Sequence, residues 1–297
     1  MCSEKDIFDV AKTAAFTLYN TDMPDIPVLL SVPHAGRDYP PELMANLRVP
    51  PTDLLRLEDR YADRLIQPAI ASRYPAIIAH RARAYIDLNR AETDIDSGMV
   101  TGVDALLNAA PSAKARGGLG LFPRRLQACG ELWRCPMEPA DVEQRIEHVH
   151  APYHHAIAEI LSAMRVRFGV AILIDVHSMP PIPAGAMQDP PPQIVVGDRF
   201  GRSAASIYAE MVTGRAETSG KRAALNAPYS GDYILKRHGD PGRGIHALQL
   251  EIDRSLYLDS DLREPTAGLK MMTDFVQSVV SDLADQALGA SFAEAAE

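Results

Sequence analysis

Four short apolar runs along the chain have the length and composition of buried β-strands. They are rich in Val, Ile and Leu and are bounded by Pro, Gly or charged residues, a pattern typical of strands. They are "IPVLLSV" (26–32), "AIIAH" (76–80), "GVAILIDV" (169–176) and "QIVVGD" (193–198). A fifth run, "IHALQLEID" (245–253), places apolar residues at 248, 250 and 252 and is also predicted to be a strand.

Helical patterns separate these strands. Apolar residues recur at helical spacing over 53–70, with Thr52 or Asp53 as the N-cap, over 141–169, and over 266–288. The second of these helices should end at Gly169 and be kinked or split by Pro152. The alternation of strands and helices predicts a single α/β domain over 1–297, built as three α/β/α layers around a mixed, mostly parallel sheet.

Polar residues interrupt the apolar pattern where several predicted strands end. His34 follows the first strand, and Asn89 and Arg90 end "AYIDLNR" (84–90). His177 lies at the end of the strand that starts at 169, and Glu251 lies near the end of the last strand. In open α/β sheets, ligands bind at the carboxyl ends of the strands. The convergence of these polar residues at one edge therefore predicts a site there.

Composition narrows the classes of function. The chain has 297 residues, a net charge of -9 and no basic stripe, so we expect neither nucleic acid nor a membrane surface as a partner. Three cysteines in no zinc-binding spacing argue against a disulfide framework and favour a reducing compartment. There is neither a signal-peptide pattern nor an apolar run of membrane-spanning length, which predicts a cytoplasmic protein.

His177 has two interpretations. It is either a core histidine hydrogen-bonded to Asp175, or a metal ligand or catalyst at the mouth of the sheet. Two distant histidines, His34 and His177, together with a carboxylate suit a catalytic zinc, which takes three protein ligands and keeps one position for water. Asp175 then suits an outer-sphere partner of His177, and Glu251 suits a base that accepts a proton from water.

The carboxylate ligand should come from "LEDRYADRL" (57–65). Three acids stand in this segment, and Asp59 and Asp63 would share one face of a helix. The alternative is a solvated helix face, in which the acids pair with neighbouring arginines. A second histidine pair, His150 and His154 in "HVHAPYHH", also has metal-ligand spacing, but a structural role is favoured because no third ligand is evident.

Taken together, the motifs resemble the N-formylglutamate amidohydrolase family over about residues 27 to 260. They are "SVPHAG", "LEDRYADRL", "RAYIDLNR", "GLGLFPR", "PYHHAI", "LIDVHSM", "YSGDYI" and "GRGIHALQLEIDRSLY". The family is similar in fold and metal chemistry to the zinc carboxypeptidases and to succinylglutamate desuccinylase and aspartoacylase. The resemblance implies zinc-dependent cleavage of the formyl amide of N-formyl-L-glutamate, with water as co-substrate, at a late step of histidine degradation.

The resemblance also implies roles for single residues. It places Zn²⁺ on His34, Asp59 and His177, with Glu58 as the alternative acid, and it makes Glu251 the general base. Asn89 and Arg90 resemble the pair that holds a substrate carboxylate, for which a guanidinium offers a bidentate clamp. The candidates for a second carboxylate or for the oxyanion are Arg254 and Arg243.

The chain departs from the family in one segment. Members of the histidine pathway carry a "TDWHVDRL"-like stretch where this chain has "LEDRYADRL". The departure bears on the substrate more than on the metal, so two further functions stay open. One is a carboxypeptidase-like activity on a peptide or cell-wall fragment, and the other is a metal-free protein that binds an acidic ligand. The Pro-rich stretch 179–193 is predicted to be a loop. If this loop closes the cleft, a small substrate is favoured, and if it leaves an open groove, a peptide is favoured.

Overall fold

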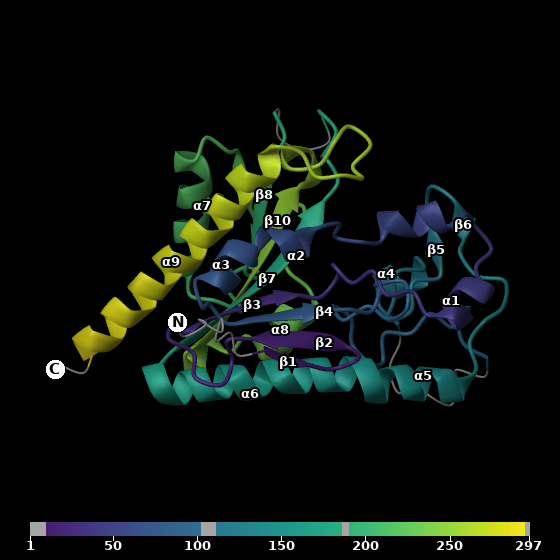
Figure 1. The fold of residues 1–297 in the computed structure, drawn as a ribbon, viewed down its shortest axis with the longest axis horizontal. Helices are drawn as coiled ribbons and strands as arrows, with labels where there is room; N and C mark the ends of the chain where they lie inside the picture. The colour runs from purple at the N-terminus through teal and green to yellow at the C-terminus, as the bar shows by residue number, and fades with distance from the viewer. Residues whose placement is uncertain (1–9, 102–110, 186–189, 295–297) are drawn as a thin grey trace, which may run out of the picture.

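The computed structural model describes residues 10–101, 111–185 and 190–294. Eight strands form one mixed sheet, in the order β1-β2-β4-β3-β7-β10-β8-β9 (Figure 1). Their bounds are Val10–Lys12 (β1), Phe16–Tyr19 (β2), Val28–Val32 (β3), Ala76–Ala79 (β4), Ala171–Met179 (β7), Ile194–Gly197 (β8), Ala223–Leu225 (β9) and Ile245–Asp253 (β10).

The strands at the centre of the sheet run in one direction. β4, β3, β7 and β10 are neighbours and pair in parallel, and β8 pairs with β9 in parallel. Antiparallel pairs join β1 to β2, β2 to β4, and β10 to β8. The sheet is therefore mixed and mostly parallel, as predicted. The carboxyl ends of β3, β7 and β10 lie at the same edge of the sheet.

Helices cover both faces of the sheet. Alternation along β3 turns Leu30 toward one face and Leu29 toward the other, and the paired Ile174 and Leu173 of β7 follow the same pattern. The Leu30 face is covered by α2 (Ala62–Leu65), α3 (Gln67–Ala71), α7 (Ser206–Thr218) and α9 (Gly268–Glu294). The Leu29 face is covered by α6 (Ala151–Phe168) and α8 (Tyr233–His238). The predicted three-layer α/β class is confirmed.

The long helical stretch changes its hydrogen bonding where a break was expected. It consists of α5 (Pro139–Arg145), a π-helical segment, η3 (Ile146–His150), and α6, in whose first turn Pro152 lies. Proline has no N–H to donate, so regular α-helical bonding cannot continue through it. The stretch ends at Gly169, whose φ of 80° is the left-handed conformation expected of a C-cap glycine.

The helix predicted over 53–70 is wrong. The segment is a 3₁₀ helix, η1 (Pro51–Arg56), then a turn, then α2 and α3. Tyr61 has a φ of 58°, which no helix interior accommodates, and the Asp59 N–H bonds the His34 carbonyl at 2.9 Å. The N-cap of η1 is Pro50, so the N-cap prediction is also wrong.

The stretch 84–90 is a loop and not a strand. Its N–H groups bond to nearby residues of the same segment, such as Arg90 N to Asp87 O at 3.2 Å, or to another loop, such as Asp87 N to Leu121 O at 2.8 Å, instead of to a sheet neighbour. The remaining short elements include α1, α4, β5 and β6, which group beyond one end of the sheet (Figure 1). Their bounds, with those of η4 and η5, are Pro41–Ala45 (α1), Ala113–Arg116 (α4), Arg125–Leu126 (β5), Gly130–Glu131 (β6), Pro241–Arg243 (η4) and Arg254–Leu256 (η5).

None of the helices in the described part of the chain is both long and apolar enough to cross a membrane.

Candidate active site

Three parallel strands deliver polar side chains to one edge of the sheet. His34 follows β3, His177 lies on β7, and Glu251 lies on β10 in register with His177. All three are buried and line one cavity of about 260 Å³. The convergence predicted from the strand ends is therefore present in the fold.

His34, Asp59 and His177 form a group that could hold a metal ion, referred to below as the metal group, and the cavity that they line is the metal-side cavity. Their candidate ligand atoms lie within 4.8 Å of one another, and all three side chains are buried. Asp59 Oδ2 is 2.8 Å from His177 Nδ1 and 3.5 Å from His34 Nδ1. Asp59 reaches this position because its turn follows η1 and is held by the His34 carbonyl, which brings the two segments together.

Each histidine of the group is oriented by a second carboxylate. His177 Nε2 lies 2.7 Å from Asp175 Oδ2, and His34 Nε2 lies 2.7 Å from Asp87 Oδ1. Histidines that bind a metal usually have their other ring nitrogen held by such an acceptor, which fixes the tautomer and ring orientation. Asp175 was expected in this role. Asp87 was missed, and the only signal in the sequence was its position in "AYIDLNR", two residues before Asn89.

Within this group, each side chain favours the charged form of its neighbour. Burial alone would raise the pKa of Asp59, but the hydrogen bond from His177 at 2.8 Å and the nearby His34 ring hold it well below its usual range. Burial likewise opposes protonation of His177, yet the neighbouring Asp175 and Asp59 carboxylates raise its pKa well above the ordinary value. The two carboxylates therefore favour the protonated form of His177 when no metal is bound.

The donor set fits zinc. His34 Nδ1 is buried, points into the group and has no hydrogen-bond partner among the described residues. An unpartnered buried nitrogen costs free energy that a metal bond would recover. Two imidazole nitrogens and one carboxylate oxygen form one of the ligand sets of catalytic zinc sites.

The other acids of "LEDRYADRL" do not belong to the group. Glu58 is also buried, but it accepts hydrogen bonds from the Tyr39 hydroxyl and, at 2.9 Å, from Arg60 Nη1. Asp63 pairs with Arg37 near the surface, at 2.6 Å. Asp59 and Asp63 do not share a helix face, because Asp59 precedes α2.

Arg254 contacts the metal group directly. Its Nη2 donates to Asp59 Oδ1 at 3.1 Å, and its Nε donates to Ser178 Oγ at 3.0 Å. The guanidinium also lines the cavity. Arg254 was predicted to meet a substrate carboxylate or the oxyanion, but in this arrangement its hydrogen bonds hold the oxygen of Asp59 that faces away from the histidines.

Glu251 lies on the cavity wall with one oxygen already engaged. Gln249 Nε2 donates to Glu251 Oε1 at 2.8 Å, and no hydrogen bond to Oε2 is found among the described residues. Burial raises the pKa of Glu251 to about 7. A carboxylate with such a pKa is suited to take and return a proton near neutral pH.

Asn89 and Arg90 reach the cavity from the loop that was expected to be a strand. The Asn89 amide lies 3.3 Å from His177 Nε2, and Arg90 Nη1 donates to Asp232 Oδ2 at 2.9 Å. His150 and His154 secure this loop: their Nε2 atoms bond the carbonyls of Arg90 and Leu88 at 2.8 and 2.9 Å. The structural role favoured for these two histidines is confirmed.

Two further cavity residues complete the polar wall. Arg83 binds Asp87 Oδ2 through Nε at 2.8 Å, and Tyr229 faces the same cavity. Arg83 was missed by sequence reasoning, although its spacing of four residues from Asp87 was a signal. Met179, the last residue of β7, and Pro180 of the Pro-rich loop also line the cavity. Residues 186–189 of that loop lie outside the described residues, so the expectation of a lid is not tested.

Arg243 is the predicted site residue that the structure places elsewhere. It belongs to η4, which precedes β10, and its carbonyl accepts a hydrogen bond from Arg165 Nε at 2.7 Å. The first residues of a parallel strand lie at the edge opposite its carboxyl end, so Arg243 is remote from Glu251 and does not line the cavity. The expected contact between Arg243 and a substrate is wrong in this fold.

Comparisons with known proteins agree with this geometry. N-formylglutamate deformylases from Pseudomonas aeruginosa and Pseudomonas putida are 28% and 29% identical to the chain. These matches cover 89% and 81% of this chain, and 93% and 88% of the relatives. The solved structure of an N-formylglutamate amidohydrolase from Ralstonia eutropha JMP134 matches with a TM-score of 0.83 at 27% identity, covering 93% of this chain and 99% of that one.

The family comparison covers the whole site. The sequence model of N-formylglutamate amidohydrolase matches residues 26–258, a span that contains both histidines, Asp59 and Glu251. The chain belongs to the N-formylglutamate amidohydrolase family.

Proposed function

We propose that this protein is a zinc-dependent amidohydrolase that cleaves the N-acyl amide of N-formyl-L-glutamate or a closely related N-acyl amino acid. The observation that carries the proposal is the position of Glu251, a buried carboxylate on the wall of the cavity that also holds His34, Asp59 and His177. Membership of the family and the names of its relatives support the same substrate class.

His34, Asp59 and His177 would hold the metal. When bound, zinc supplies Lewis-acid chemistry: it polarises an amide carbonyl and lowers the pKa of a water molecule. Asp87 and Asp175 keep the two imidazoles in the tautomer that leaves Nδ1 for the metal. Arg254 fixes the Asp59 carboxylate.

Glu251 acts as the general base and then as the general acid. Its free oxygen accepts a proton from the attacking water and returns it to the amide nitrogen, which leaves as the amine of glutamate. Burial favours this role because it brings the pKa of Glu251 close to neutrality. Gln249 holds the other oxygen and keeps the carboxylate oriented.

Arginines of the cavity wall suit the carboxylates of the substrate. Arg83 and Arg90 both line the cavity, and Arg83 is bonded only through Nε among the described residues. A guanidinium with free nitrogens can clamp a carboxylate. Asn89, next to Arg90, also lines the cavity. These contacts would orient the formyl group toward Glu251.

Formate release from N-formyl-L-glutamate by the zinc-loaded protein tests the proposal. We expect turnover with N-formyl-L-glutamate to exceed that with N-formyl-L-alanine, which lacks the second carboxylate. Binding of N-formyl-L-glutamate without formate release, unaffected by the removal of zinc, would instead support the metal-free binding protein. A cytoplasmic location, expected from the sequence pattern, and a role in histidine degradation, implied by the family resemblance, belong to the proposal.

A further inference from the structure

A second and larger cavity adjoins the active site. Its volume is about 500 Å³, compared with about 260 Å³ for the cavity that holds the metal group. The two cavities share four residues of their walls: Asn89, Arg90, Lys114 and Asp232. The smaller cavity suits a single N-acyl amino acid, being near the lower limit for small-molecule sites, so such a substrate leaves the second cavity empty.

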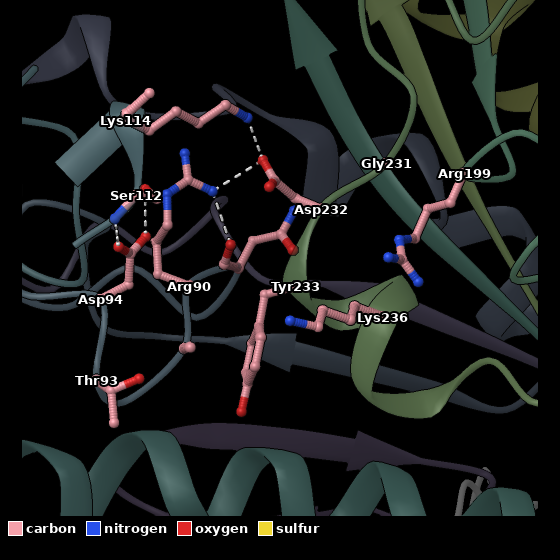
Figure 2. Close-up of a pocket in the computed structure, with 13 residues that line it drawn as sticks. Arg90, Thr93, Asp94, Ser112, Lys114, Arg199, Gly231, Asp232, Tyr233 and Lys236 are labelled. Atoms are coloured by element: carbon pink, nitrogen blue, oxygen red, sulfur yellow. Dashed lines mark hydrogen bonds and ion pairs between the residues drawn. The ribbon is translucent and has the colours of Figure 1, made fainter. Parts of the chain in front are cut away.

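An ion-pair cluster forms the boundary between the two cavities. The Asp232 carboxylate binds Arg90 Nη1 at 2.9 Å and also contacts the Lys114 ammonium (Figure 2). Burial alone would raise the pKa of Asp232, but these two cations lower it. Asp232 is thus an anion that neutralises cations on the path from the metal group into the second cavity.

Beyond this boundary the second cavity is positively charged. Of the described residues that line it, Arg199 and Lys236 are cations for which no carboxylate partner is found within ion-pair distance among the described residues. Among the described residues that line it, Asp94 is the only acid besides Asp232, and its oxygens accept hydrogen bonds from the N–H and hydroxyl of Ser112 at 2.8 Å. Figure 2 shows Arg199 and Lys236 on the side of the cavity opposite Asp94.

The backbone holds Arg199 in a defined position. The Arg199 N–H donates to the Ser230 carbonyl at 2.7 Å, which ties this loop to the segment that leads into Asp232. Lys236 lies on α8, a helix that packs against β7 and β10. Two cations without carboxylate partners, carried by separate elements, therefore face one cavity that continues from the active site.

We propose that this cavity is a subsite for a second acidic residue of the substrate, and that the enzyme also deacylates N-acyl glutamyl peptides. The inference rests on the proposed function. The acylated residue occupies the metal-side cavity, and the following residue passes Arg90 and Asp232 so that its carboxylates meet Arg199 and Lys236. Charge-assisted bonds to these two cations would make the second residue contribute to binding.

The test compares N-formyl-L-glutamate with its dipeptide extension on the parent, a double variant and a control variant. The substrates are N-formyl-L-glutamate and N-formyl-L-glutamyl-L-glutamate, the latter in both its α-linked and γ-linked forms. The proteins are the zinc-loaded parent and the double variant Arg199→Met with Lys236→Met, which keeps side-chain length and removes charge. Arg202→Met is the matched control, because Arg202 is exposed, lies three residues from Arg199 and does not line either cavity.

We expect the parent to release formate from at least one dipeptide isomer with a KM no higher than that for N-formyl-L-glutamate. The double variant should raise the dipeptide KM about tenfold, while the KM for N-formyl-L-glutamate changes less than twofold. Arg202→Met should change neither value. Equal effects of the double variant on both substrates, or no effect on either, would overturn the subsite.

A binding measurement distinguishes failure of this inference from failure of the proposed function. If the parent hydrolyses neither substrate, the proposed function fails, and calorimetric titration of the same dipeptides into parent and double variant still tests the subsite. Tenfold weaker dipeptide binding by the double variant supports it, and equal binding overturns it. If the variant weakens binding of free L-glutamate but not of the dipeptide, the cavity is a site for a separate acid and the extension is wrong.

Discussion

Asp59 serves two sets of partners through its two carboxylate oxygens. Oδ2 faces His34 and His177, while Oδ1 accepts a hydrogen bond from Arg254. A carboxylate held on one oxygen presents the other in a fixed direction, which lowers the entropic cost of binding a metal. The burial of all these side chains makes each hydrogen bond costly to break.

Arg254→Met should weaken zinc binding by about 10- to 100-fold, the usual effect of losing an outer-sphere partner of a metal ligand. Competition with a chromogenic chelator measures the affinity. Arg263→Met is the control, since Arg263 lies on a neighbouring surface cavity and does not line the metal-side cavity. Unchanged affinity in Arg254→Met would show that Asp59 needs no such support.

Glu251→Gln should lower kcat by about 10²- to 10⁴-fold, the range for loss of a general base, while zinc content stays at the parental level. The amide has the same shape but cannot accept the proton. Steady-state formate release and elemental analysis on the same preparation measure both. Loss of zinc together with activity would contradict the assigned role, because it would make Glu251 part of the metal group.

Glu251 also affects the stability of the metal-free protein. Its pKa in the folded state, about 7, lies above the ordinary value of 4.5, so the folded state binds the extra proton. That contribution is complete below about pH 4.5 and is lost as pH rises through 7, by about 1.4 kcal/mol per pH unit. We expect Glu251→Gln to gain stability relative to the metal-free parent between pH 5 and 8 in urea unfolding. A constant difference would contradict it.

At the scale of elements, α6 and α8 hold the loop that carries Asn89 and Arg90. His154 Nε2 bonds the Leu88 carbonyl, and its Nδ1 lies 2.9 Å from His238 Nε2 on α8. The two rings stack with their centroids 5.2 Å apart. The position of this cavity-lining loop therefore depends on a buried histidine pair that links two helices.

This pair should make folding sensitive to acid. Burial lowers the pKa of His154 well below its ordinary value and that of His238 to about 3, so both stay neutral in the folded protein. The unfolded chain takes up these protons below about pH 6.5, so stability falls as pH falls below that value. His238→Asn should reduce this fall by about 1.4 kcal/mol per pH unit in urea unfolding between pH 6 and 5.

The exposed His155 provides the control for that measurement, because His155→Asn removes a histidine of α6, the helix that carries His154, without touching the pair. It should leave the pH dependence of stability as in the parent. An equal pH dependence in His238→Asn and the parent would show that the pair is not the source of the acid sensitivity.

The sequence predicted well the strands whose own pattern of apolar residues is sufficient to define them. Runs rich in Val, Ile and Leu predicted β3 and β7, and the alternating apolar residues 248, 250 and 252 predicted β10, each within a few residues. The loop 84–90 misled because Ala84, Ile86 and Leu88 alternate like a strand and are indeed buried, yet their backbone finds no sheet partner. The turn at Asp59 also depends on a tertiary contact, the bond to the His34 carbonyl.

At the scale of the whole molecule, the strand order decides which residues meet. Because β3, β7 and β10 are parallel neighbours, His34, His177 and Glu251 could be predicted to share an edge from the strand ends alone. The same rule explains why the prediction for Arg243 was wrong, because Arg243 precedes β10 and lies at the opposite edge of the sheet. Asp87 and Arg83 carried only local signals, namely the position of Asp87 in "AYIDLNR" and the four-residue spacing between the two. The folded loop brings Arg83 into the cavity and Asp87 against His34.

The central claim is that His34, Asp59 and His177 hold one zinc ion, and elemental analysis tests it most directly. The parent, His34→Ala, His177→Ala and the control His155→Ala are incubated with zinc and dialysed together. We expect about one zinc per chain in the parent and in the control, and a loss of zinc in both site variants. A parent that stays empty, or site variants that keep their zinc, would contradict the account.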